Sequence, residues 1–190
     1  MIGFIHIPKN GGSSIKHWLR SNGIEIAGIQ HQTFSQVDVD RAPWWFAVTR
    51  NPFERIVSYY EFTRIKSARM LKKNIDDIAR QAHTTALDLY YTGFKNWLFN
   101  YGTVNTQFNI TQTQFITRDD QKINIVLRLE SIELDWKIIQ ERTGIYKPLQ
   151  ISNTTKKLSN NYFDSESIEF VINHWREDFI NFDYPYTTDL

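Results

Sequence analysis

The sequence predicts a three-layer α/β fold in which a central parallel sheet is flanked by helices. Apolar runs at about 2–7 and 44–49 have the character of strands that are buried on both faces. Segments with helical periodicity, such as 13–22 and 131–143, alternate with these runs. Strands and helices that alternate in this way form parallel sheets with right-handed crossovers.

Length and composition predict one domain over residues 1–190, because the chain is long enough for a substantial core. The net charge of +1 argues against a dedicated nucleic-acid binder, which would present a strongly basic face. No apolar stretch approaches the roughly 20 residues of a membrane span. The first strand begins at Ile2, which leaves no room for a leader segment. We therefore expect a cytoplasmic protein without a membrane span; its oligomeric state stays open.

The elements follow from local signals. Asn22 and Gly23 tolerate the left-handed backbone of a helix end, so they end the helix over 13–22. Asn51 and Pro52 suit the cap and first turn of a helix. The remaining expected elements are a short strand at 25–29, a mostly helical region at 66–120 with a loop at about 100–114, a strand at 123–129, a helix at 131–143 that stops at Gly144, and a final helix at 165–181.

A glycine turn after the first strand indicates a site for an anion. Lys9 precedes Gly11 and Gly12, and two serines follow where a helix is expected to begin. Backbone N–H groups of such a turn converge on one point, where the helix dipole also favours negative charge. The turn is not a Walker A loop, because that motif places its lysine after the last glycine. The alternative is an ordinary strand-to-helix turn with a solvated lysine.

A second basic segment begins with Arg50, at the carboxyl end of the strand over 44–49. Open α/β sheets bind their ligands at this end. Arg55 and Ser58 are three residues apart, so they project from the same side of the expected helix. A guanidinium binds phosphate bidentately, which favours a second anion here. In isolation, this segment is more typical of a solvated helix face, with Arg50 paired to a carboxylate.

Together the two segments resemble the sulfotransferases that use 3′-phosphoadenosine 5′-phosphosulfate (PAPS), particularly the carbohydrate-modifying branch. That family holds the 5′-phosphosulfate with a Pro-Lys-x-Gly-Gly-x-Ser-like loop, which matches 8–14. It holds the 3′-phosphate with an Arg-x-Pro-x-x-Arg-x-x-Ser-x-Tyr segment, which matches 50–60. The stretches at 153–157 and 178–184 also look familial. The resemblance is specific over about 2–64, loose over about 66–120, and implies a P-loop-like fold.

By this resemblance, Lys9 contacts the bridging oxygen and the sulfuryl group as charge develops there. The residues implied in binding the nucleotide fall into three groups. They are Pro8, Lys9, Asn10, Gly11, Gly12, Ser13 and Ser14 around the 5′-phosphosulfate, Arg50 and Ser58 with Arg55 at the 3′-phosphate, and Lys156 and Lys157 closing over the nucleotide. A lysine pair on a polar loop is also typical of a solvated surface.

His31 is the candidate for the catalytic base. It follows the short second strand, and several carbohydrate sulfotransferases place a catalytic histidine in the corresponding loop. An imidazole with a pKa near neutrality suits removing a proton from an attacking hydroxyl. One alternative is that His31 is simply a surface histidine. Another is that a carboxylate such as Glu61 is the base. His6 is expected to be a hydrogen-bonded core residue.

The resulting hypothesis is a sulfotransferase that moves the sulfuryl group of PAPS to an acceptor hydroxyl, on a carbohydrate, and releases adenosine 3′,5′-bisphosphate. The histidines and carboxylates show no metal-binding spacing, and we expect no metal requirement. One alternative is a nucleotide-dependent kinase, disfavoured because the order of lysine and serine is wrong. The other is a non-catalytic nucleotide-binding protein on the same fold.

Overall fold

The computed structural model describes residues 1–28, 31–103, 106–119, 121–151 and 162–188. These residues form two compact units. The first, here called the sheet unit, comprises Met1–Asn51 and Ile110–Thr154. The second, here called the helical unit, comprises Pro52–Asn109 and Thr155–Leu190. The expectation of one domain over residues 1–190 stays a prediction.

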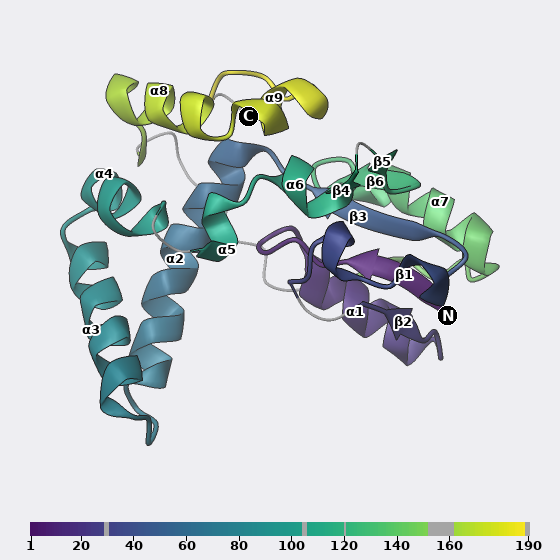
Figure 1. The fold of residues 1–190 in the computed structure, drawn as a ribbon, viewed down its shortest axis with the longest axis horizontal. Helices are drawn as coiled ribbons and strands as arrows, with labels where there is room; N and C mark the ends of the chain where they lie inside the picture. The colour runs from purple at the N-terminus through teal and green to yellow at the C-terminus, as the bar shows by residue number, and fades with distance from the viewer. Residues whose placement is uncertain (29–30, 104–105, 120, 152–161, 189–190) are drawn as a thin grey trace. The chain divides into compact units, whose positions relative to one another are not determined.

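The sheet unit is built on four parallel strands in the order β2-β1-β3-β6 (Figure 1). Their bounds are β1 (Ile2–Ile5), β2 (Ile26–Ala27), β3 (Trp45–Thr49) and β6 (Ile125–Arg128). The two central strands, β1 and β3, are buried along their whole length. Strands buried on both faces read as continuous apolar runs, which is the pattern that predicted them. The predicted parallel sheet is therefore confirmed.

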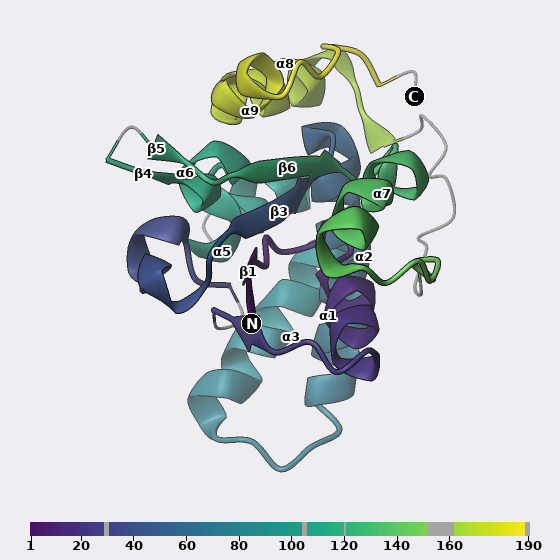
Figure 2. The same cartoon turned by 90° about the vertical axis from the view of Figure 1, so that its right-hand side faces the viewer.

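Helices flank this sheet, as predicted. Helices α1 (Gly12–Ser21) and α7 (Ile132–Thr143) lie side by side on one face (Figure 2), where the rings of Trp18 and Trp136 meet edge to face with centroids 5.1 Å apart. Two 3₁₀ turns, η1 (Phe34–Gln36) and η2 (Val39–Arg41), pack on the opposite side of β3 against Trp45. Gly144 ends α7 in the left-handed conformation, as its sequence position indicated.

Part of the sheet unit differs from its expectation. The loop expected at about 100–114 contains helical turns, including α6 (Gln112–Ile116), which Thr111 and Gln114 begin with a reciprocal capping box. A short antiparallel hairpin, β4 (Thr117–Arg118) with β5 (Gln121–Lys122), follows it. The many Asn, Thr and Gln residues suggested a loop, but the side-chain cap supplies the hydrogen bonds that start a helix.

The helical unit contains the expected helical middle of the chain and its C-terminal helices. Its elements are α2 (Pro52–Met70), α3 (Asp77–Tyr91), α4 (Phe94–Trp97), a π-helical turn η3 (Leu98–Gly102), α5 (Thr106–Asn109), α8 (Ser165–His174) and α9 (Arg176–Asn181). One final helix was expected, but the chain bends at Trp175, which caps both α8 and α9. The bend buries the Trp175 ring and lets its Nε1 donate to the carbonyl of Phe108 at 3.1 Å.

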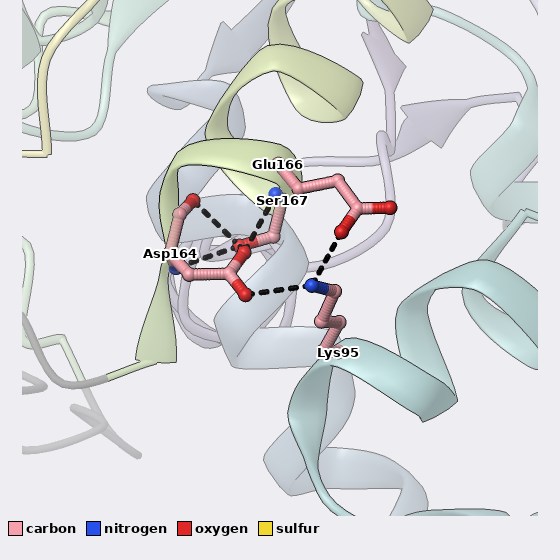
Figure 3. A network of polar contacts seen from close by, with 4 residues as sticks. All are labelled: Lys95, Asp164, Glu166 and Ser167. Atoms are coloured by element: carbon pink, nitrogen blue, oxygen red, sulfur yellow. Dashed lines mark hydrogen bonds and ion pairs between the residues drawn. The ribbon is translucent and has the colours of Figure 1, made fainter.

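An ion-pair cluster connects α4 to the start of α8 (Figure 3). Lys95 Nζ lies 2.8 Å from an oxygen of Asp164 and 2.5 Å from one of Glu166. Asp164 is also the N-cap of α8 and accepts from the backbone N–H of Ser167. Because the lysine and both carboxylates are solvated, the cluster orients the start of α8 more than it stabilises the fold. Among the described helices, none has both the length and the apolar character of a membrane span.

Candidate functional site

The candidate site lies where the strand order changes direction. From β1 the chain crosses to β2 on one side, whereas β3 lies on the other side of β1 and is followed by β6. The carboxyl ends of such diverging strands leave a crevice in which open α/β sheets bind ligands. Lys9 comes after β1 and Arg50 directly after β3. The two predicted anion-binding segments therefore begin at neighbouring strand ends.

The turn after β1 has the backbone of an anion cradle. Lys9 and Gly11 have positive φ values, of 71° and 76°, and α1 begins at the next residue, Gly12. A residue other than glycine pays a cost for this conformation, so Lys9 is held in it by its surroundings. Gly11 is the N-cap of α1 and brings no side-chain acceptor to the first-turn N–H groups. The helix N-terminus can therefore offer these donors to an anionic ligand.

Lys9 and Arg50 lie together at this point. Arg50 Nη1 donates to the backbone carbonyl of Lys9 at 3.3 Å. Burial, and secondly the charge of Arg50, lower the pKa of Lys9 to about 8. Two neighbouring cations repel each other, and an anion that lies close to both offsets this repulsion. The arrangement thus favours a ligand with strong negative charge.

A buried glutamine joins these two segments. Gln112, at the start of α6, has no solvent exposure, and its Oε1 accepts from Asn10 Nδ2 at 2.6 Å and from Arg50 N at 2.9 Å. Its Nε2 donates to the carbonyl of Arg50 at 2.8 Å. Asn10 Nδ2 also donates to the carbonyl of Val48, near the end of β3, at 2.8 Å. Asn10 therefore anchors the turn with its side chain, whereas Ser13, further along, is exposed.

The structure places His31 beside the same turn. The His31 ring meets the His6 ring edge to face, with centroids 4.9 Å apart, and its backbone has a φ of 65°. His6 is buried, and its pKa falls to about 3 because of burial first and then the charges of Lys16 and His31. His6 therefore stays neutral at physiological pH. Its Nδ1 has no hydrogen-bond partner among the described residues, so the expected hydrogen bond of a core histidine is not seen at that atom.

His6 also explains why α1 begins with glycine. A Cβ on Gly12 would lie 2.0 Å from Cδ2 of the His6 ring. That ring stacks on Phe4 and meets His31, so it has little room to turn aside. Gly12 is thus required by close packing rather than by its backbone angles.

Arg55 and Ser58 lie on α2 in the helical unit. Both are buried, and the guanidinium of Arg55 lies over the ring of Phe108 at 5.2 Å. Burial lowers the pKa of Arg55 to about 10, whereas Asp178 acts in the opposite direction. The other candidate base, Glu61, accepts hydrogen bonds from the hydroxyls of Tyr90 and Tyr162 at 3.2 and 3.0 Å. Lys156 and Lys157 lie outside the described residues.

Two site residues were missed from the sequence. Gln112 was inside an expected loop, although the Thr111–Gln114 capping pattern is a signal for a helix start there. Glu130, which follows β6, accepts from the backbone N–H of Asn51 at 2.7 Å through Oε1. No local pattern indicates either contact, because each joins residues far apart in the sequence. No group of three His, Asp or Glu suited to a metal ion occurs in the part of the chain that the structure describes.

A family model described as "Sulfotransferase family" matches residues 2–185, which is nearly the whole chain. No curated protein and no solved structure matches the chain.

Proposed function

We propose that this chain, which belongs to the sulfotransferase family, transfers the sulfuryl group of PAPS to an acceptor hydroxyl on a carbohydrate. One observation carries the proposal: Lys9 and Arg50 lie together at diverging strand ends, beside a helix that begins at a glycine cap. PAPS carries a phosphosulfate and a separate 3′-phosphate, and these negative groups match the positive charge and the hydrogen-bond donors gathered here. The carbohydrate acceptor comes from the resemblance of the two motifs to the carbohydrate-modifying branch.

The residues present fit the anionic end of this donor. The loop from Pro8 to Ser14 supplies backbone N–H groups at the start of α1, and Lys9 supplies a cation in the same turn, near the charge of Arg50. Arg50 supplies a guanidinium suited to bidentate phosphate binding. The proposal also includes the roles that the resemblance implies for four further residues: binding of the 3′-phosphate by Arg55 and Ser58, and closure over the nucleotide by Lys156 and Lys157.

His31 is the proposed base. Bound PAPS supplies an activated sulfuryl group, whose transfer leaves adenosine 3′,5′-bisphosphate. His31 takes the proton of the acceptor hydroxyl as the new oxygen–sulfur bond forms and the bond from sulfur to the phosphate oxygen breaks. Lys9 and the loop N–H groups stabilise the charge on the departing phosphate. A pKa of about 8 keeps most of Lys9 charged at neutral pH, yet able to share a proton with the leaving oxygen.

The test measures nucleotide binding and transfer separately. We expect calorimetry without magnesium to show that the protein binds adenosine 3′,5′-bisphosphate more tightly than ATP, and that Lys9→Ala and Arg50→Ala each weaken binding tenfold or more. Radiolabelled PAPS offered with a panel of glycans then reports transfer. His31→Ala is expected to lower transfer at least 100-fold and to leave binding of the bisphosphate intact.

Matched controls come from the same unit. His17 and Lys122 are exposed, on α1 and β5, and their replacement by alanine is expected to leave binding and transfer unchanged. A preference for ATP would support the kinase alternative. Binding of PAPS without transfer to any acceptor would support a non-catalytic nucleotide-binding protein. Full transfer by His31→Ala would exclude His31 as the base.

A further inference from the structure

Gln112 has an unusual position for a polar side chain. It is the first residue of α6, has no solvent exposure, and uses both ends of its amide in hydrogen bonds. None of these bonds stabilises α6 itself. They reach to Asn10 in the turn after β1 and to the backbone of Arg50 after β3. A buried amide with this pattern connects other parts of the chain.

The hydrogen bonds define the orientation of both amides. Arg50 offers an N–H and a carbonyl, so the Gln112 oxygen must face the first and its nitrogen the second. The Asn10 nitrogen must then face the Gln112 oxygen and the carbonyl of Val48, because the opposite orientation would place oxygen against two acceptors. The two amides and the end of β3 therefore form one consistent set. Its geometry holds Asn10 and Arg50 at a defined separation.

This separation matters for the proposed site. Asn10 is next to Lys9 in the turn, and Arg50 donates to the Lys9 carbonyl through a contact of 3.3 Å. That contact is longer than the 2.6 to 2.9 Å bonds made by Gln112 and has one donor. Besides the direct bond from Asn10 to the carbonyl of Val48, the shorter, doubly bonded link through Gln112 holds the turn to the residue that follows β3.

We propose that Gln112 is a positioning residue, which holds the Lys9 turn against the end of β3 so that Lys9 and Arg50 serve one anionic ligand. The inference rests on the proposed function in one respect, that this ligand is the sulfuryl-donor nucleotide. Gln112 itself contacts neither nucleotide nor acceptor in this proposal.

The test compares Gln112→Met with Gln121→Met. Both replace a glutamine of the sheet unit, but Gln121 is exposed on β5 and takes no part in the cap that starts α6. We expect Gln112→Met to raise the Kd for adenosine 3′,5′-bisphosphate and the KM for PAPS at least tenfold, with a smaller change in kcat. Gln121→Met is expected to leave Kd and KM within twofold of the original values.

A second readout needs no nucleotide. Loosening the turn exposes Lys9 and moves it from Arg50, so the pKa of Lys9 is expected to rise from about 8 toward its ordinary value in Gln112→Met. NMR titration of labelled lysine, assigned with Lys9→Arg, measures it. Asn10→Ala removes the same bond from the other side, together with the bond from Asn10 to the carbonyl of Val48, and leaves α6 unchanged. If Gln112→Met does not fold, an unchanged Lys9 pKa in Asn10→Ala overturns the positioning role, and a rise supports it.

The outcomes separate the two proposals. Folded Gln112→Met and Asn10→Ala that keep both the bisphosphate affinity and the Lys9 pKa would overturn the positioning role and leave the proposed function intact. If the unsubstituted protein binds neither the bisphosphate nor PAPS, the proposed function is overturned. In that case the Lys9 pKa alone decides: a rise supports the positioning role, and an unchanged value refutes it.

Discussion

Lys9 combines three properties that are seldom found in one lysine. Its backbone has a positive φ, its side chain is partly buried, and a guanidinium lies close to it. Each of these costs free energy without a bound ligand: the positive φ strains the backbone, whereas desolvation and repulsion oppose the charged form of the amine. An anion that contacts both cations removes much of the repulsion. Residue 9 is therefore suited to a ligand that carries its own negative charge.

The pKa of Lys9 predicts a pH limit on activity. A lysine is charged below its pKa, so the charged fraction falls as pH rises through about 8, instead of near 10.4 as for an ordinary lysine. We expect kcat/KM for PAPS to decline about tenfold per pH unit above pH 8, because kcat/KM reports the free enzyme. Profiles from pH 6 to 10 measure this decline.

Lys9→Arg is the control for this profile. A guanidinium keeps its charge over the whole range, so the variant is expected to lose activity overall and to show no decline near pH 8. The same decline in Lys9→Arg would assign it to another group.

At the scale of elements, the junction of β1 and α1 determines where the helix dipole points. His6 follows β1 and its ring lies against Gly12, the first residue of α1. The close approach of ring and backbone places the N-terminus of α1 over the carboxyl end of β1. The N–H groups at the start of α1 are therefore close to the carboxyl end of β1, where a helix N-terminus can bind an anion.

Gly12→Ala tests that junction. The added Cβ would overlap the His6 ring, and we expect a loss of about 2 kcal/mol in the free energy of unfolding, as for other overpacked cores. Replacing His6 by alanine as well removes the overlap, so the double variant should be at least about 1 kcal/mol more stable than the two single losses predict. Urea unfolding of the four proteins measures this coupling. Additive losses would show that the ring and Gly12 do not constrain each other.

At the scale of the whole molecule, the chain passes between the two units three times, after residues 51, 109 and 154. Each unit is therefore made of two separate stretches of sequence. Neither unit can be released as one continuous piece, because the chain leaves the sheet unit after β3, returns to it at Ile110 and leaves it again after residue 154. Such connectivity favours folding as one cooperative domain, as the sequence predicts.

Thermal unfolding with the bisphosphate tests the single domain and the ligand together. We expect one transition, and about a hundredfold excess of adenosine 3′,5′-bisphosphate over its Kd to stabilise the protein by about 2.7 kcal/mol. For a chain of this size that corresponds to a rise in Tm of roughly 5 to 10 °C. Lys9→Ala should lose most of this rise, and Lys122→Ala should keep it.

Calorimetric scans distinguish the alternatives. Two separate transitions, with one of them moved by the bisphosphate, would show that the sheet unit binds and unfolds alone and would refute the single domain. A single transition whose Tm does not change with the bisphosphate, at concentrations up to the millimolar range, would argue that the protein does not bind this nucleotide.

The sequence by itself determined the parallel sheet, the turn after β1 and the basic residue after β3. These features depend on contiguous residues: an apolar run, glycines at a turn, and a lysine or arginine at a strand end. Their family resemblance also agrees with the match to the sulfotransferase family over residues 2–185. Local chemistry is readable from a single chain because neighbours in sequence are neighbours in space.

Only the tertiary structure decided how these segments are held together. Asn10 and Gln112 are 102 residues apart in sequence, and the glutamine belongs to a stretch whose composition suggested a loop. The His6 ring, expected in the core, lies against Gly12 and beside His31 because β1, α1 and the chain after β2 converge. Hydrogen bonds and packing between distant segments leave no periodic pattern in the sequence, since any segment that reaches the same point with the right group can make them.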